Sequence, residues 1–209
     1  MSNNDLFKTL ERADDAPPNP YDLFQSWMDD AGKSEINDPN AMSLATIEAS
    51  GMPAVRVVLL KGLDERGFVF YTNSESDKGK ALAQTPKAAL CFHWKTLQRQ
   101  VRIQGTVEQV SESEADEYYN SRHRGSRIGA WASAQSSPLE SRTTLQERVT
   151  AFEEKFKDSD IIPRPPFWNG YRVSPSCIEF WHDGSYRLHT RVVYLPQSEG
   201  VWSKTMLYP

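Results

Sequence analysis

The sequence contains little cysteine, no long apolar run and no excess of positive charge, and each shortage excludes a class of protein. Its two cysteines, Cys91 and Cys177, both lie in apolar stretches of the 209-residue chain. This favours reduced thiols in a cytoplasmic protein over a disulfide scaffold or a metal site. No stretch reaches the roughly 18 apolar residues of a membrane span, and we expect no signal peptide in the polar residues 1–5. The net charge of −4 excludes a general affinity for nucleic acid, so any anion site must be a local cluster of basic side chains.

The spacing of apolar residues predicts a flexible arm at residues 1–19 and a single folded domain at residues 20–209. The arm is polar and proline-rich at its end. In the domain, strands are expected at residues 42–49, 54–60, 68–72, 88–94, 100–110, 170–181, 187–195 and 201–207, and helices at residues 21–31, 76–84, 113–121, 126–134 and 139–156. Many short, mostly antiparallel strands with helices between two strand groups predict an α+β fold built on a small β-barrel with flanking helices.

Residues 187–191, Arg-Leu-His-Thr-Arg, are the most informative stretch of the chain. In a β-strand alternate side chains share a face, so Arg187, His189 and Arg191 would lie together. Three potentially cationic groups repel one another unless an anion or carboxylates lie against them. A solvated outer face of a sheet explains the same pattern, and the stretch alone leaves both interpretations open.

Basic and hydroxyl side chains also gather where predicted strands end. Arg56 and Lys61 close one strand, Tyr71 and Thr72 close the next, and Lys78 follows at the start of a predicted helix. Hydroxyls, lysines and a helix N-terminus are groups that bind phosphate. Each of them alone is equally typical of a solvated strand end, and in an ideal strand Arg56 and Lys61 face opposite sides. The chain has neither a Rossmann glycine motif nor a P-loop.

A second cluster follows in the helical middle section. Tyr118 and Arg122 are four residues apart and share one face of a helix, and Ser126 lies just beyond. A phenol, a guanidinium and a hydroxyl suit a second phosphate, although a surface helix end explains them as well. Gln135 and Ser136 offer hydrogen bonds to a planar, amide-rich ring, and a helix cap explains Ser136 equally well.

Taken together, these stretches resemble the pyridoxine (pyridoxamine) 5′-phosphate oxidases, which are FMN enzymes with an antiparallel split-barrel fold. The resemblance runs in order from about residue 20 to the C-terminus. The matching positions are 56–61, 70–73, 94, 97, 99–101, 118, 121–122, 126, 128–131, 135–137, 167–168, 178–181, 187–189 and 191.

The resemblance implies a homodimer with FMN at the interface and a vitamin B6 phosphate as the substrate. The implied FMN contacts are Arg56, Lys61, Tyr71, Thr72, Lys78, Gln100, Gln135, Ser136, Trp181 and Arg191. The implied substrate contacts are Lys61, Tyr118, Arg122, Ser126, Arg187 and His189, of which Arg187 and His189 form the catalytic pair over the substrate ring.

The expected activity is oxidation of pyridoxine or pyridoxamine 5′-phosphate to pyridoxal 5′-phosphate, with O₂ as electron acceptor and H₂O₂ as product. The alternative is a non-catalytic split-barrel protein that binds FMN or pyridoxal phosphate; retention of both residue sets speaks against it. A deazaflavin-dependent reductase of the same fold would have no use for the substrate set.

Three positions depart from the family pattern. Asp77 stands where the family has arginine, and we expect it to point outward and pair with Lys80. Thr190 replaces an acidic residue. The N-terminal arm lacks a match to the arginine and tyrosine with which the family helps to close its active site.

Overall fold

The longest strand, β7 (Trp168–His182), organises the sheet. One edge of β7 pairs with β6, while the other edge pairs first with β4 and then with β8. The computed structural model describes residues 3–198 and 200–209, in which every strand pairing is antiparallel and the order is β2-β1-β5-β6-β7-β4-β3. The other strands are β1 (Ala41–Ile47), β2 (Pro53–Leu59), β3 (Gly62–Asp64), β4 (Gly67–Asn73), β5 (Lys87–Trp94), β6 (Arg99–Gln109), β8 (Thr190–Ser198) and β9 (Val201–Met206).

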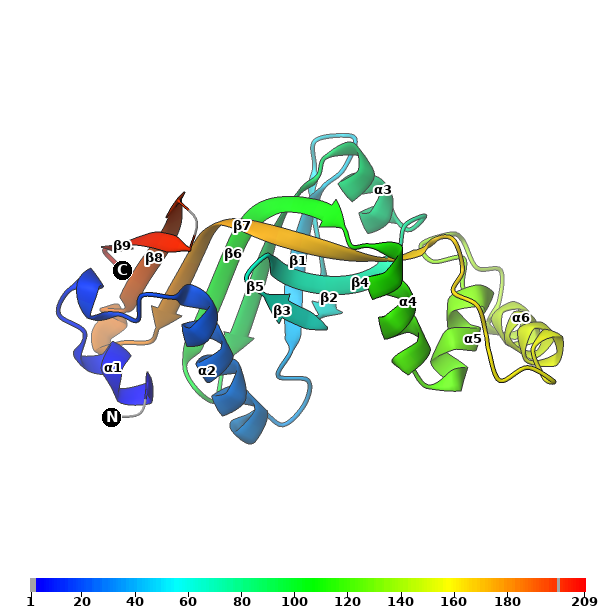
Figure 1. The fold of residues 1–209 in the computed structure, drawn as a ribbon, viewed down its shortest axis with the longest axis horizontal. Helices are drawn as coiled ribbons and strands as arrows, with labels where there is room; N and C mark the ends of the chain where they lie inside the picture. The colour runs from blue at the N-terminus through cyan, green and yellow to red at the C-terminus, as the bar shows by residue number, and fades with distance from the viewer. Residues whose placement is uncertain (1–2, 199) are drawn as a thin grey trace.

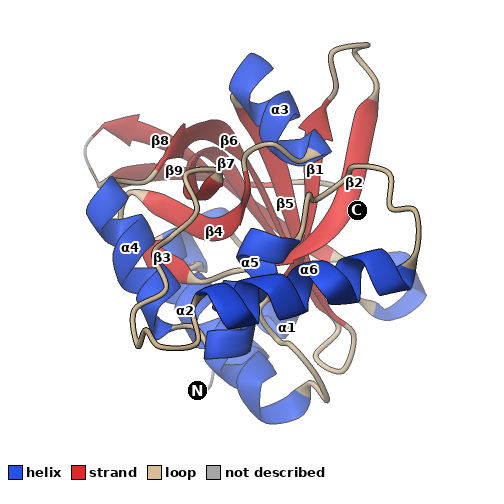
Figure 2. Cartoon of the chain, turned by 90° about the vertical axis from the view of Figure 1, so that its right-hand side faces the viewer, coloured by secondary structure: helices blue, strands red, loops and turns tan. Residues whose placement is uncertain are grey.

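The helices lie at the two ends of this curled sheet and over one of its faces (Figure 1). Near one end α1 lies beside the β8–β9 hairpin, and at the other end α5 and α6 lie side by side (Figure 2). The helices are α1 (Asn3–Thr9), α2 (Pro20–Ser34), α3 (Asp77–Gln84), α4 (Glu112–Ser121), α5 (Arg124–Ala132) and α6 (Arg142–Lys155), with short 3-10 turns η1 (Ala13–Asp15) and η2 (Ser185–Arg187). None of these helices, within the described residues, has the length and apolar content that crossing a membrane requires.

Helix α2 closes the core of the barrel. The side chain of Asn19 caps its first turn by accepting a hydrogen bond from the backbone N–H of Tyr21, at 2.9 Å. Its apolar face is fully buried, and the Phe24 ring meets Phe68 and Phe92 edge to face with centroids 5.0 and 4.9 Å apart. Such contacts add to the free energy gained by removing the rings from water. The predicted amphipathic helix and the predicted α+β class are confirmed.

Strand β8 begins later than the sequence predicted, while β9 begins at the expected residue. We expected a strand from residue 187, whereas Arg187 belongs to the turn η2 and β8 begins at Thr190. The prediction that Arg187, His189 and Arg191 alternate along one strand is therefore wrong. Tyr186 and Arg187 have φ angles of 58° and 65°, which a strand does not accommodate.

The N-terminal residues lie against the end of the sheet that carries β8 and β9. The Phe7 ring is completely buried against Trp27, and Lys204 donates hydrogen bonds to the backbone oxygens of Asp14 and Ala16. Tyr194 donates a hydrogen bond to the Pro17 oxygen at 2.8 Å. The mobility of residues 1–19 stays a prediction, but residues 7–17 have specific contacts with the domain.

Candidate functional site

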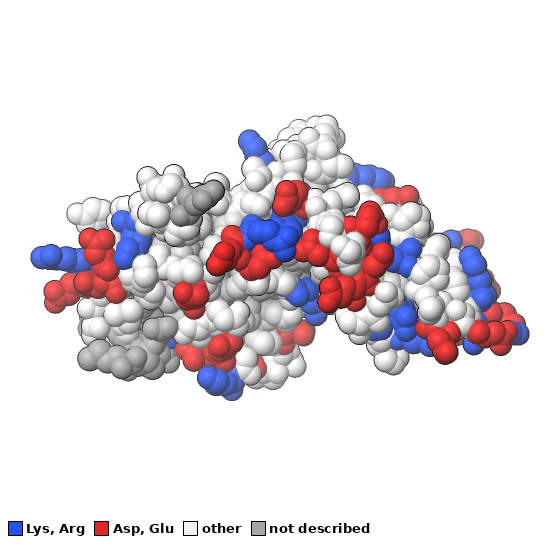
Figure 3. All heavy atoms as spheres, viewed as in Figure 1, with Lys and Arg blue, Asp and Glu red and all other residues white. Residues whose placement is uncertain are grey.

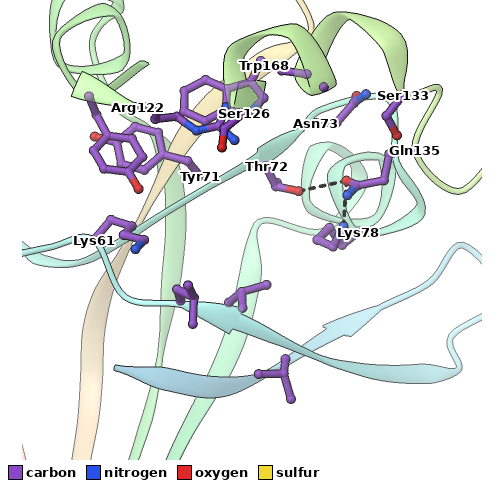
Figure 4. A pocket seen from close by; sticks show the side chains of 16 residues that line it. Lys61, Tyr71, Thr72, Asn73, Lys78, Arg122, Ser126, Ser133, Gln135 and Trp168 are labelled. Carbon is purple, nitrogen blue, oxygen red and sulfur yellow. Dashed lines mark hydrogen bonds between the residues drawn. The ribbon is translucent and has the colours of Figure 1, made fainter. Parts of the chain in front are cut away.

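One cavity of about 490 Å³ opens where β2 and β4 end and α3, α4 and α5 begin or pass. It contains many of the side chains that the sequence singled out. These are Lys61, Tyr71, Thr72, Lys78, Tyr118, Arg122, Ser126 and Gln135. Figure 4 shows Lys61, Arg122 and Ser126 toward one end of the cavity, with Thr72, Lys78 and Gln135 toward the other.

Stacked aromatic rings hold the first end in place. Tyr71 stacks on Tyr118 with ring centroids 4.1 Å apart and on Trp168 at 5.2 Å. The Arg122 guanidinium lies 4.8 Å from the centre of the Trp168 ring, a separation at which a cation attracts the face of an indole. The stack therefore fixes both a phenol and a guanidinium at the cavity wall.

Arg122 has unused capacity to bind an anion. Its Nη1 is buried and has no hydrogen-bond partner in the described part of the chain, and burial lowers the pKa of its guanidinium. A buried, unpaired N–H of a cation is costly. A phosphate between Arg122, Lys61 and Ser126 would remove that cost through charge-assisted hydrogen bonds.

The second end of the cavity is a hydrogen-bonded group around Lys78. Its Nζ donates to Gln135 Oε1 at 3.0 Å and to Ser76 Oγ at 3.3 Å, and the Thr72 hydroxyl donates to the same Gln135 oxygen at 3.2 Å. Burial and then the nearby charge of Arg56 lower the pKa of Lys78. Ser76 caps the N-terminus of α3. Two neighbouring cations at a helix N-terminus fit a second phosphate.

Arg56 and Ser136 lie beside this end without lining the cavity. The Arg56 Nη1 donates to Thr46 Oγ1 at 2.6 Å and to the backbone oxygens of Leu44 and Ala54, so β1 and β2 hold its side chain. Ser136, at φ 71°, accepts a hydrogen bond from the backbone N–H of Asp77 at 3.3 Å. Both residues therefore flank the start of α3.

The prediction that Asp77 forms an ion pair with Lys80 is wrong. In the residues that the structure describes, Asp77 and Lys80 form no ion pair, although both border a small hollow beside Glu48. The charge of Asp77 instead acts on Arg56, whose pKa is lowered chiefly by burial and raised in part by Glu48 and Asp77. The carboxylate thus offsets some of the positive charge at the second end of the cavity.

Helix α5 and its C-cap Ser133 supply a cavity wall of which the motifs predicted only Ser126 as a contact. Ser126, Gly129, Ala130 and Ser133 recur at helical spacing, and all of them line the cavity. A Cβ built on Gly129 meets no atom within 4 Å, so packing does not demand glycine in this helix. The repeat of small side chains was the available signal. Its effect is to leave room for a bound molecule.

An ion cluster holds α4, and with it Tyr118 and Arg122, against the sheet. Arg172 on β7 is 4% exposed and pairs with Glu114 at 2.7 Å and with Asp64 at 3.5 Å. Arg66 joins both carboxylates from the β3–β4 turn. Arg172 holds the pKa of Glu114 down to about 2, with help from hydrogen bonds of Ser111. Acidic and basic side chains gather over this part of the surface in Figure 3.

The remaining predicted residues lie elsewhere. Arg187 and His189 line a second cavity, of about 1030 Å³, formed by the turn at residues 182–190 together with Phe7, Lys8 and Gln98. Gln100, Trp181 and Arg191 face one another across β6, β7 and β8 in register. The structure of one chain therefore separates the predicted site residues into two groups, which lie toward opposite ends of the sheet (Figure 1).

Fold and cavity together define a class: a curled antiparallel split barrel with a cavity that carries basic groups at both ends. Comparisons with known proteins identify the family. Residues 28–156 match the family model for pyridoxamine 5′-phosphate oxidase. Residues 168–209 match the model for the pyridoxine 5′-phosphate oxidase C-terminal dimerisation region. The chain belongs to the pyridoxine/pyridoxamine 5′-phosphate oxidase family, as the motifs predicted.

Individual relatives agree. A pyridoxine/pyridoxamine 5′-phosphate oxidase of Brucella canis is 59% identical over 191 residues, which cover 91% of this chain and 94% of the relative. The crystal structure of PhzG from Burkholderia lata, in complex with tetrahydrophenazine-1-carboxylic acid, has a TM-score of 0.86 at 32% identity and covers 94% of this chain and 96% of its own. An FMN-binding protein of Nostoc punctiforme related to pyridoxamine 5′-phosphate oxidase shares the fold, with a TM-score of 0.72 at 15% identity over 93% of this chain and all of its own.

Proposed function

We propose that the protein oxidises pyridoxine 5′-phosphate or pyridoxamine 5′-phosphate to pyridoxal 5′-phosphate, using FMN and O₂ and releasing H₂O₂. The observation that carries the proposal is a single cavity with basic groups at both ends. One end suits the phosphate of the substrate and the other the phosphate of FMN. The 59% identity to the Brucella oxidase over most of the chain supports the same activity.

The residues present fit FMN. Lys78 and the nearby Arg56 are two cations that repel each other, and a bound anion would relieve that repulsion. The N-terminus of α3 adds backbone N–H donors. Gln135 carries an amide into the cavity, where Thr72 and Lys78 already fix its orientation. When bound, FMN supplies the redox chemistry by taking up a hydride equivalent from the substrate and passing the electrons to O₂.

The protein's own contribution is binding and orientation. Arg122, Tyr118, Lys61 and Ser126 hold the substrate phosphate, and the ring stack with Trp168 keeps the first two from moving. Fixing the substrate in one orientation removes an entropic cost from the chemical step. We assign Arg187 and His189 to the opposite face of the substrate ring.

The separation of the two groups supports a homodimer in which each active site combines the cavity of one chain with residues 181–191 of its partner. Arg187 and His189 lie outside the cavity that holds Arg122, yet they lie within the segment that matches a dimerisation region. FMN at the interface would then touch both chains. The two free thiols suit the reducing cytoplasm that we propose as its location.

The first experiment measures activity directly. The purified protein should show a flavin spectrum and should produce pyridoxal phosphate and H₂O₂ in equal amounts from pyridoxamine 5′-phosphate. Unphosphorylated pyridoxine should react far more slowly. Bound flavin without turnover would favour the non-catalytic alternative, and faster oxidation of a tetrahydrophenazine carboxylate would indicate a substrate like the ligand bound in PhzG.

The second experiment tests the shared site. Arg122→Leu and Arg187→Ala should each be nearly inactive alone. In a mixed dimer one of the two sites receives both wild-type residues, so random pairing should restore roughly a quarter of wild-type activity. Mixtures of either variant with itself serve as controls. No recovery in a dimer shown to be mixed would mean that each site is built from one chain.

A further inference from the structure

The turn that carries His189 also brings an aspartate to its ring. Asp183 follows the end of β7, and its backbone N–H donates to the Gln98 oxygen at 2.9 Å. Gly184 comes next, where a Cβ would stand 2.0 Å from the Leu188 oxygen. This close approach returns the chain so that the Asp183 carboxylate reaches His189, with Asp183 Oδ1 2.9 Å from Nδ1.

Two groups compete for that one ring nitrogen. Besides Asp183 Oδ1, the backbone N–H of Gly184 points at Nδ1 from 3.2 Å. Nδ1 accepts from Gly184 only if it carries a lone pair, and it donates to Asp183 only if it carries a proton. The two contacts exclude each other, so the proton position of the ring decides which of them exists.

The carboxylate wins this competition. A hydrogen bond to an ionised carboxylate is about twice as strong as a neutral one, and the Asp183 contact is also the shorter. A lone pair on Nδ1 would face the carboxylate oxygen at 2.9 Å and be repelled by it. We infer that Asp183 is a positioning residue that keeps a proton on His189 Nδ1 and leaves Nε2 as the nitrogen available to a ligand.

The surroundings of His189 fit this role. The ring packs on Trp181 with centroids 4.6 Å apart, which fixes its plane. Nε2 has no hydrogen-bond partner in the described residues, and the ring lines the same cavity as Arg187 and Lys8.

The functional consequence rests on the proposed oxidase activity. A free lone pair on Nε2 accepts a hydrogen bond from the alcohol or amine group at the carbon that is oxidised. With the proton on Nε2 instead, the ring could only donate to that group and could no longer accept a hydrogen bond from it. Asp183 therefore acts on catalysis through His189 and makes no contact with the substrate.

Nitrogen NMR of the FMN-loaded protein tests the proton position without relying on activity. The chain has four histidines, so labelling with ¹⁵N-histidine gives four rings, and His189→Gln identifies the relevant one. The neutral His189 ring should carry its proton on Nδ1. In Asp183→Asn the Gly184 N–H should prevail and move the proton to Nε2. His182, whose Nδ1 contacts the Asp183 backbone oxygen at 2.7 Å, should keep its tautomer and serves as an internal control.

Kinetics supplies the second measurement. Asp183→Asn should lower kcat by about tenfold, the effect of one hydrogen bond, with FMN content and KM nearly unchanged. Asp183→Glu should restore part of the loss, and Asp158→Asn, an exposed carboxylate outside this turn, should change neither reading. A wild-type proton on Nε2, or an Asp183→Asn protein with an unaltered tautomer, would overturn the inference. An inactive wild-type protein that still shows the Nδ1 proton would refute the proposed function alone.

Discussion

The two cavities that hold the predicted site residues are built in opposite ways. In the first, side chains come from strand ends and helices, and stacked rings or hydrogen bonds fix them. In the second, Arg187 and His189 come from a short turn, beside Tyr186 and Leu188, which are 96% and 71% exposed. The first is organised within one chain, whereas the second presents apolar side chains that the described residues leave exposed.

Two consecutive strained backbone residues lie in the second region, whereas Ser136 beside the first cavity is a single one. Tyr186 and Arg187 are consecutive non-glycine residues in the left-handed region, which costs roughly 1–2 kcal/mol each. Such strain persists where the surroundings impose it and is common at functional sites. A partner chain seated on this turn would both cover Leu188 and Tyr186 and hold Arg187 in its position. In the proposed dimer, the half of the site that holds Arg187 and His189 would therefore depend on assembly, while the half that holds Arg122 and Lys78 is already formed in one chain.

The largest effect should come from Arg187→Ala, which removes a side chain from the second region only. We expect kcat/KM to fall by ~10²-fold or more, about 2.7 kcal/mol of transition-state binding. FMN content should stay near normal, because the proposed cofactor contacts of Arg191 and Trp181 would remain. Steady-state kinetics and flavin absorbance check this. Loss of flavin with unchanged substrate affinity would show that the two groups have their roles reversed.

The first region was the more predictable of the two. Lys61 and Tyr71 lie at strand ends and Tyr118 lies on α4, and regular elements carry such patterns into space by known rules. Arg122 reaches the same cavity, although α4 ends at Ser121 and Arg122 follows it in extended conformation, so the two do not share a helix face as predicted. The cavity wall from α5 was missed because Gly129 and its small neighbours look ordinary without the space beside them. Trp168 was identified as part of a motif, but its stacking partner Tyr71 lies on β4, more than 90 residues earlier in the chain.

The second region could not be derived from alternation. The pattern Arg-x-His-x-Arg is typical of a strand, yet the two left-handed residues just before Leu188 make a turn. In the same turn the Gly184 backbone passes so close to the Leu188 backbone that a side chain on Gly184 would not fit, and alternation of residue types does not reveal such a close approach. Helix α1, within the expected flexible arm, and the short strand β3 were not predicted. The other helices and most strands were predicted within a few residues, because their apolar periodicity is strong.

Glu114→Gln weakens the ion cluster that supports the first region and leaves the second region unchanged. Arg172 and Arg66 would lose a carboxylate partner, so we expect about 2 kcal/mol of lost stability near neutral pH. The KM for the phosphorylated substrate should rise because α4 carries Tyr118 and Arg122. An unchanged KM with normal stability would mean that the ion cluster does not position α4.

The same residue gives a pH dependence with a definite sign. The folded-state pKa of Glu114 is about 2, against an ordinary value of 4.5. Its contribution to stability is therefore complete above pH 4.5 and is lost as the pH falls through about 2. Denaturant titrations between these limits should show a smaller acid loss for Glu114→Gln than for the wild type. Equal slopes in both proteins would contradict the shifted pKa.

Gly129→Ala separates helix stability from ligand binding in the first region. Alanine in place of a helical glycine should stabilise the protein by up to about 1 kcal/mol, because the added Cβ meets no atom within 4 Å. Gly129→Leu extends further into the cavity and should weaken binding of substrate or FMN much more than Gly129→Ala. Thermal unfolding and binding titrations check the two effects. A Leu variant with full affinity would show that the space beside Gly129 is not used by a ligand.

The smallest effect concerns Asp77, at the second end of the cavity. Its carboxylate offsets the charge of Arg56 near the start of α3, where the FMN phosphate is proposed to bind. Asp77→Arg should tighten FMN binding by roughly two- to fivefold at low salt, or about 0.5–1 kcal/mol, because exposed charges are well screened. The apoprotein should become slightly less stable, since an acidic residue in the first turn interacts favourably with the helix dipole.

Fluorescence titration of FMN at two salt concentrations tests the gain in affinity of Asp77→Arg, which should shrink at high salt. Lys80→Gln, a change in the same helix at an exposed position that does not line the cavity, is the control. Unchanged or weaker affinity in Asp77→Arg would mean that the phosphate does not lie at this helix end, and the assignment of Lys78 to the cofactor would then be wrong.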